Sequence, residues 1–131
     1  MRGKVLAIDY GRKAVGFASG DLELGLAFPR AVLRNRGVNL LVDEVLKVVA
    51  ELEVVRVVVG MPSVGSVRHD IAAFVALLQA RGLDVVMVDE DNSSVEAGQM
   101  FDRDGGAAGV GRMDANAAQV ILQRYFGGEC R

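Results

Sequence analysis

The chain has 131 residues, of which 51% are hydrophobic, and it carries a formal net charge of −2 with one cysteine and one histidine. This length suits a single domain, residues 1–131, with enough apolar side chains for a packed core. The slightly acidic balance excludes a protein that coats nucleic acid through a generally basic surface, although it does not exclude a nuclease. No apolar stretch reaches the roughly 18 to 20 residues that a membrane span requires. We therefore expect a cytoplasmic protein that does not contact a membrane.

The first third of the chain has the alternation and the turns of an antiparallel meander. Strands are predicted over residues 4–10, 14–19 and 24–33, with turns at Gly11 and at Gly20-Asp21 between them. Pro29 cannot donate a hydrogen bond to a neighbouring strand. The third strand should therefore lie at an edge of the sheet.

The rest of the chain alternates between helical and strand patterns. Strands are expected over residues 54–60 and 85–88, and helices over 39–52, 66–80, 93–102 and 114–126. The run over 54–60 is apolar on both faces, which is typical of a buried parallel strand. The Gly/Ala-rich segment 104–111 predicts a mobile loop. Together these elements predict an α/β fold with a five-stranded mixed sheet, in which the three-stranded meander joins two parallel strands, flanked by helices.

Three acidic residues mark the points where an apolar run meets a loop or a helix. Asp9 and Glu90 close two strands that we expect to be adjacent and parallel, and Asp114 heads the last predicted helix as its N-cap. Each also has an ordinary reading, as a turn residue, a solvated strand end and a helix cap. Together they suggest more, because ligands bind at the carboxyl ends of strands in open α/β folds.

Converging carboxylates require a compensating charge. Two like charges about 4 Å apart repel by roughly 4 kcal/mol at an effective dielectric near 20. Mg²⁺ or Mn²⁺ prefers carboxylate and water oxygens, and two such ions roughly 3.5 to 4 Å apart would activate a water for in-line attack on phosphorus. The acidic set therefore predicts a divalent-metal site for phosphodiester hydrolysis.

Other chemistries fit the sequence poorly, while one further segment suits a phosphate. His69 has no matching serine or cysteine motif, so a catalytic triad is disfavoured. The glycine-rich stretch completes neither a dinucleotide fingerprint nor a Walker loop. Gly65 and Ser66 precede a predicted helix, whose N–H groups could hold a phosphate, and an ordinary turn with a cap is an equal alternative. Candidates for positioning phosphates through side chains are Arg12, Lys13, Arg68 and Arg112.

The segment from Ala7 to Ala18, which begins Ala-Ile-Asp-Tyr-Gly-Arg-Lys, resembles the opening motif of the YqgF (RuvX-like) nucleases. Residues 58–62, 88–90 with 93–97, and Asp114 with 117–123 match the later motifs of that family in order. The resemblance implies an RNase H-like fold and a metal-dependent nuclease, with Asp9, Glu90 and Asp114 as the metal-binding set.

The same resemblance implies a nucleic-acid partner, either structured RNA or branched DNA. Members of the family are associated with maturation of the 5′ end of the small-subunit ribosomal RNA precursor and with resolution of four-way DNA junctions. A homodimer would suit the two-fold symmetry of such a junction.

Two positions depart from the family pattern, since Asp91 and Ala14 stand where basic residues are expected. These changes reduce the expected phosphate contacts, and Asp91 would add a fourth acidic group near the site. Two other functions fit the same fold: an actin-like module that binds nucleotide phosphates, and a scaffold domain that has lost hydrolysis.

Overall fold

The computed structural model describes residues 3–89 and 110–129, and within these ranges the side chains of 3–89 and 117–127. The helix expected over 93–102 and most of the loop expected over 104–111 lie outside the described residues. Everything below refers to the described ranges.

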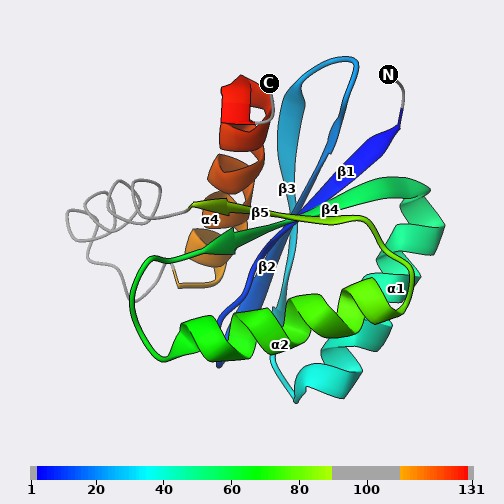
Figure 1. Cartoon of the computed structure of the whole chain (residues 1–131). Helices are drawn as coiled ribbons and strands as arrows, with labels where there is room; N and C mark the ends of the chain where they lie inside the picture. Colours follow the sequence, from blue (N-terminus) through cyan, green and yellow to red (C-terminus); the bar gives the residue numbers. More distant parts are fainter. Residues whose placement is uncertain (1–2, 90–109, 130–131) are drawn as a thin grey trace.

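One five-stranded mixed sheet forms the centre of the molecule (Figure 1). Its strand order is β3-β2-β1-β4-β5, with antiparallel pairing from β1 to β3 and parallel pairing from β1 to β5. The strands are β1 (Lys4–Asp9), β2 (Ala14–Asp21), β3 (Leu26–Arg34), β4 (Val54–Met61) and β5 (Val85–Asp89). The predicted α/β class, with a meander joined to parallel strands, is confirmed.

The outer strand β3 contains an irregularity at its proline. Ala18 pairs with Pro29 and Phe17 pairs with Ala31, so Arg30 is an extra residue in the ladder. Such a bulge is common at a sheet edge, where a residue without an N–H is tolerated. The predicted edge position of this strand is confirmed.

The parallel part of the sheet differs from the prediction in its strand order. β4 lies between β1 and β5, so the strands that precede Asp9 and position 90 are parallel but not adjacent. The expectation that they are neighbours is wrong. The physical reason is the composition of β4, in which Val57, Val58 and Val59 are at most 1% exposed, because a strand apolar on both faces is most stable in the interior of the sheet.

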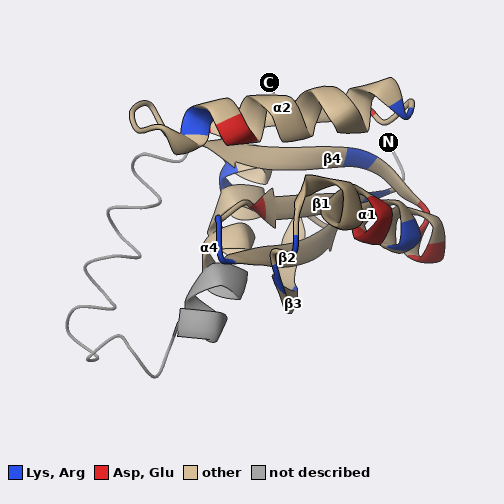
Figure 2. Ribbon diagram, turned by 90° about the horizontal axis from the view of Figure 1, so that it is seen from below, with Lys and Arg blue, Asp and Glu red and all other residues tan. Residues whose placement is uncertain are grey.

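Helices cover both faces of the sheet (Figure 2). α1 (Val38–Leu52) and α2 (Val67–Ala80) pack on one face, and α4 (Val110–Arg124), continued by the π-helical turn η2 (Tyr125–Glu129), packs on the other. Two helix starts differ from the prediction. α1 begins at Val38, one residue before the predicted start, and α4 begins at Val110, so Asp114 lies inside the helix and is not its N-cap.

Two apolar layers hold these elements together. On the α1 and α2 face the core includes the predicted helix residues Ile71, Phe74, Val75 and Leu78. On the α4 face it includes Ala118, Ile121, Leu122 and Tyr125, which are at most 3% exposed. Alternate residues of each strand therefore belong to opposite layers, and this alternation fixes the face on which each site residue lies.

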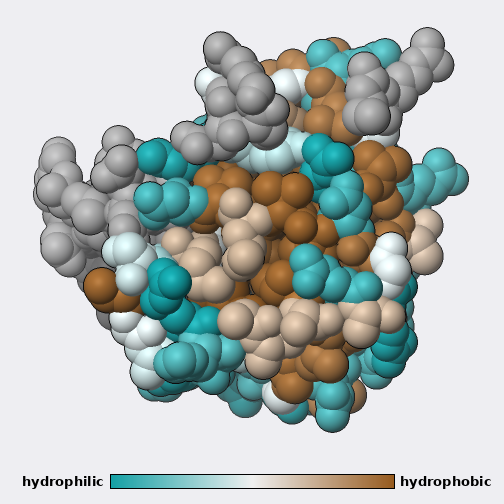
Figure 3. Space-filling view, viewed as in Figure 1, coloured by the Kyte–Doolittle hydropathy of each residue, from teal (hydrophilic) through white to brown (hydrophobic). Residues whose placement is uncertain are grey.

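The surface also retains large apolar side chains. They include Leu24, Leu26 and Phe28 around the β2–β3 hairpin, each more than half exposed. Figure 3 shows apolar surface gathered over the middle of one face, with hydrophilic side chains around it. Across the described ranges, none of the helices has both the length and the apolar character needed to cross a bilayer.

Candidate functional site

Asp9 is the last residue of β1 and lies on the face of the sheet that α4 covers. Val5 and Ala7 belong to the apolar layer under α4, and Asp9 follows them with the same parity. Its side chain is partly buried, and its neighbour across β2 is Gly16. A partly buried carboxylate at the carboxyl end of a central strand is the arrangement expected of a ligand-binding acid.

The C-terminal end of α4, continued by η2, is attached to the sheet at the end of the strands that lies opposite Asp9. The Arg56 guanidinium donates from one terminal nitrogen to the Tyr125 hydroxyl oxygen at 2.7 Å and from Nε to the Asp84 carboxylate at 2.8 Å. Both bonds raise the pKa of Arg56 above its ordinary value, and the bond to Tyr125 has the larger effect. Arg56 pairs with Val5 in the strand register, so Tyr125 marks the level at which β1 begins.

The lengths of the two elements then relate position 114 to Asp9. Asp9 lies four residues beyond Val5, a rise of about 13 Å along β1. Position 114 lies eleven residues before Tyr125, a rise of about 16 Å along the helix axis. The two rises are similar in length, and both positions belong to the α4 side of the sheet, because Asp9 has the parity of the β1 residues that pack under this helix.

The side chains of Glu90 and Asp114, the other two predicted metal ligands, are not among those that the structure describes. Glu90 lies outside the described residues, and Asp114 and Arg112 lie in the part of α4 whose side chains are not described. Among the side chains that are described, no three His, Cys, Asp or Glu residues gather closely enough to hold a metal ion. The assignment of Asp9, Glu90 and Asp114 to one metal site therefore stays a prediction.

Two of the predicted phosphate-positioning residues meet at the carboxyl edge of the sheet. Arg12, in the turn between β1 and β2, donates from a terminal nitrogen to the Ser66 hydroxyl at 2.9 Å. Its Nε donates to the Asp70 carboxylate at 2.6 Å. The turn after β1 is thereby tied to the N-terminal end of α2, although the two segments are more than fifty residues apart.

Asp70 was not identified from the sequence. It lies in the first turn of α2, four residues after Ser66, and residues at that spacing share one face of a helix. An acid at this position is favoured by the helix dipole. The signal was therefore present, but the pairing with Arg12 depends on the tertiary structure.

The remaining predicted residues of this edge have different surroundings. Gly65 has a φ of +107°, which favours glycine, and nothing lies within 4 Å of the place where a side chain would begin. The Arg68 guanidinium donates to the Pro62 carbonyl oxygen, so part of its hydrogen-bonding capacity is already used. Lys13 is exposed in the turn after β1.

A family model described as RuvX, Holliday junction resolvase, matches residues 3–128. The chain belongs to the RuvX Holliday junction resolvase family. Among its relatives is a protein of Nitrosospira multiformis that is 36% identical over 95% of this chain and 87% of its own length. A protein of Sulfurimonas denitrificans is 34% identical over 97% of this chain and 99% of its own length. Both carry the name "Putative pre-16S rRNA nuclease".

Solved structures agree with the fold of this RuvX family member. The RuvC protein of T. thermophilus in complex with a Holliday junction substrate aligns with a TM-score of 0.57 at 16% identity, covering 94% of this chain and 93% of RuvC. The Fowlpox virus resolvase, in complex with Holliday junction DNA, aligns with a TM-score of 0.59 at 12% identity, covering 95% and 97%. The fold is that of RuvC-like resolvases, the RNase H-like fold that the sequence predicted.

Proposed function

We propose that this protein is a metal-dependent nuclease that hydrolyses phosphodiester bonds in structured nucleic acid, either the precursor of 16S rRNA or a four-way DNA junction. Membership of the RuvX family supports a nucleic-acid hydrolase. The observation that carries the proposal in this chain is the position of Asp9, partly buried at the carboxyl end of β1 and facing the helix that contains Asp114.

In this proposal Asp9, Glu90 and Asp114 hold Mg²⁺ or Mn²⁺. Carboxylate oxygens are the donors that these cations prefer, and no thiolate or imidazole is required. When bound, two such ions supply an activated water and stabilise the oxygen that departs from phosphorus. Asp9 and Asp114 are supported as partners because Asp9 lies at the end of β1 on the face of the sheet that α4 covers.

The same proposal gives Arg12 and Lys13 the task of positioning the phosphate. Arg12 is held by Ser66 and Asp70 through Nε and one terminal nitrogen, which leaves its other terminal nitrogen for a phosphate oxygen. An arginine fixed in this way loses less side-chain entropy when it binds. Asp70 already places negative charge at the start of α2, so Gly65, Ser66 and Arg68 would make the weaker contacts, with Arg112 contributing from α4.

The test is cleavage of a panel of labelled substrates by the purified protein. Precursor 16S rRNA ends, single strands and four-way junctions are incubated with Mg²⁺, with Mn²⁺ and with chelator. We expect metal-dependent cleavage, and a loss of at least about 100-fold in the Asp9→Asn protein, as when one group that stabilises a transition state is removed. Asp43→Asn, the same change on an exposed position of α1, should cleave like the wild type.

Metal removal gives a second readout that does not require the correct substrate. An ion present at 100 times its Kd stabilises the folded state by about 2.7 kcal/mol, so Mn²⁺ should raise the Tm of the wild type and chelator should reverse the change. Asp9→Asn should abolish the shift and Asp43→Asn should preserve it. Equal cleavage by wild type and Asp9→Asn, or a Tm insensitive to metal, would contradict the proposed site and favour a scaffold domain.

A further inference from the structure

A basic pocket lies beside the proposed acidic site. Its lining consists of Arg12, Lys13, Ala14, Arg34 and Asn35, and its volume is about 500 Å³. The lining contains three cationic side chains and no carboxylate. The ion pairs found in the described part of the chain involve neither Lys13 nor Arg34. Within the described residues, Lys13 and Arg34 therefore carry positive charge that no ion pair neutralises, whereas Arg12 is paired with Asp70.

The strand register places Arg34 on the same face of the sheet as Asp9. Arg34 pairs with Ala14 of β2, and Ala14 has the same parity as Gly16, which is the direct neighbour of Asp9. Arg34 is two strands away from Asp9 and two residues further toward the carboxyl edge, about 12 Å between Cα atoms at ordinary strand spacings. Between them on this face lie Ala14, which is partly exposed, and Gly16, which is buried.

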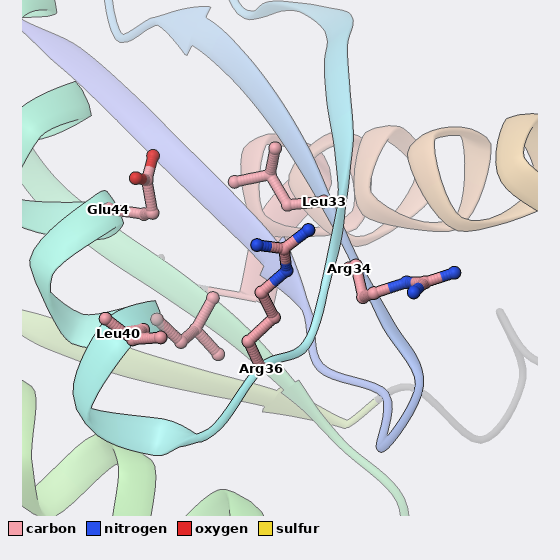
Figure 4. A pocket seen from close by; sticks show the side chains of 6 residues that line it. Leu33, Arg34, Arg36, Leu40 and Glu44 are labelled. Carbon is pink, nitrogen blue, oxygen red and sulfur yellow. The ribbon is translucent and has the colours of Figure 1, made fainter.

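The next arginine along the chain points the other way. A second pocket beside α1 is lined by both arginines, and in Figure 4 the Arg36 guanidinium lies between Leu33 and Glu44, whereas the Arg34 guanidinium extends away from them. Leu33 belongs to the apolar layer under α1 and α2. Arg34 and Arg36 are therefore close in sequence, equally charged and both exposed, but only Arg34 lines the basic pocket.

Asn35 holds the two walls of the basic pocket together. Its Nδ2 donates to the Gly11 carbonyl oxygen at 2.8 Å, and its backbone N–H donates to the Lys13 carbonyl oxygen at 2.9 Å. Its Oδ1 accepts from the Gly37 N–H at 3.0 Å. The segment after β3 is thus fastened to the turn after β1, which fixes the backbone positions from which Lys13 and Arg34 extend.

We propose that the basic pocket binds a backbone phosphate of the nucleic acid, with Arg34 as the principal contact, a few nucleotides away from the bond at the acidic site. This inference rests on the proposed function for the identity of the ligand as a nucleic acid. Arg34 is exposed in this pocket, and its planar guanidinium suits bidentate contact with a phosphate. The contact fixes where the strand lies and is independent of base sequence.

The experiment measures binding of a fluorescently labelled four-way DNA junction in chelator, where hydrolysis is not required. Affinity is determined at several salt concentrations for the wild type, Arg34→Ala and the matched control Arg36→Ala. Loss of one phosphate contact to duplex DNA lowers the magnitude of the slope of log K against log salt by about 0.9, which corresponds to about eightfold weaker binding near 0.1 M salt. We expect this change in Arg34→Ala and less than a twofold change in Arg36→Ala.

A second control tests whether the loss of affinity depends on the position of the arginine or only on the loss of one positive charge. Arg30 lies on the same strand at the bulge and lines a different pocket, with Lys4 and Phe28 among its neighbours. Arg30→Ala should therefore also bind within twofold of the wild type. Equal losses in the three variants would show only a general effect of net charge and would overturn the inference, as would an Arg34→Ala protein that binds like the wild type.

The inference and the proposed function fail in distinguishable ways. If the wild type cleaves its substrate and Arg34→Ala retains both the affinity and the salt slope, the inference is wrong and the nuclease stands. If the Arg34→Ala slope changes as expected while no metal and substrate produce cleavage, the phosphate pocket stands and the nuclease does not. A wild type that binds no junction overturns the inference directly.

Discussion

Removal of one oxygen atom tests how α4 is attached to the sheet. Tyr125→Phe deletes the hydroxyl that accepts the 2.7 Å hydrogen bond from Arg56 and leaves the ring in the core, where Tyr125 is 3% exposed. A hydrogen bond to a charged group contributes about 1.5 to 3 kcal/mol. The Arg56 side chain is 32% exposed, so water replaces part of the lost bond and the lower end, about 1.5 kcal/mol, is expected.

The expected change is large enough for thermal unfolding. With an unfolding entropy of about 2.1 cal/mol/K per residue, a chain of 131 residues loses about 5 °C of Tm for 1.5 kcal/mol. Tyr10→Phe is the matched control, because the Tyr10 ring packs on Phe74 at 5.4 Å between centroids and no hydrogen bond of its hydroxyl is found in the described structure. Its Tm should change by less than about 1 °C.

A double-mutant cycle with Arg56 tests whether the loss of stability comes from the Arg56–Tyr125 hydrogen bond. Arg56→Met also removes the donor, so the Tyr125→Phe change should cost little in that background if the two groups act on each other. Equal Tm losses for Tyr125→Phe and Tyr10→Phe would refute the reasoning, because the cost would then be that of any tyrosine hydroxyl. So would a Tyr125→Phe cost that is undiminished in the Arg56→Met protein.

Two further predictions concern the packing of Phe126 against β2 and the role of Asn35 in the basic pocket. Gly20→Ala should lose about 1 to 3 kcal/mol in chemical unfolding, because the added carbon would overlap the Leu26 carbonyl oxygen and lie 2.8 Å from the Phe126 ring, whereas Gly127→Ala meets nothing within 4 Å. A Gly20→Ala protein as stable as Gly127→Ala would contradict this packing. Asn35→Ala should weaken junction binding by several-fold at unchanged salt slope, since it loosens the pocket without removing a charge. A reduced slope would instead show direct contact by Asn35.

The sequence predicted the local parts of the fold well. The meander from β1 to β3 depends on short turns and on Pro29 at an edge, and both are visible in the chain. The order of the parallel strands depends on long connections, and there the prediction was wrong in placing the strand before position 90 next to β1. The doubly apolar β4 carried the missing information, because only an interior place buries both of its faces.

The start of α4 shows a limit of capping signals. Asp114 is a good N-cap residue, but the helix begins one turn earlier, at Val110. Arg112 and Met113 are favourable helix residues, and a single Gly111 inside the helix costs only about 1 kcal/mol. Packing of the apolar face of α4 on the sheet outweighs that cost.

Candidate site residues at strand ends and in turns could be named from the sequence, whereas those that depend on contacts between distant segments could not. Asp9, Arg12 and Ser66 were identified from motifs and turns, and the last two are in contact. Asp70 and Arg34 were missed. The first contacts Arg12 across the fold, and the second is proposed as a phosphate contact only because the register of β2 and β3 puts it opposite Ala14.

A crystal structure of the protein with Mn²⁺ shows whether Asp9 shares a divalent cation with Asp114 and Glu90. We expect anomalous density at the carboxyl end of β1, with oxygens of Asp9 and of the other two acids roughly 2.0 to 2.3 Å from an ion. Mn²⁺ bound elsewhere while these carboxylates stand on separate surfaces would contradict it.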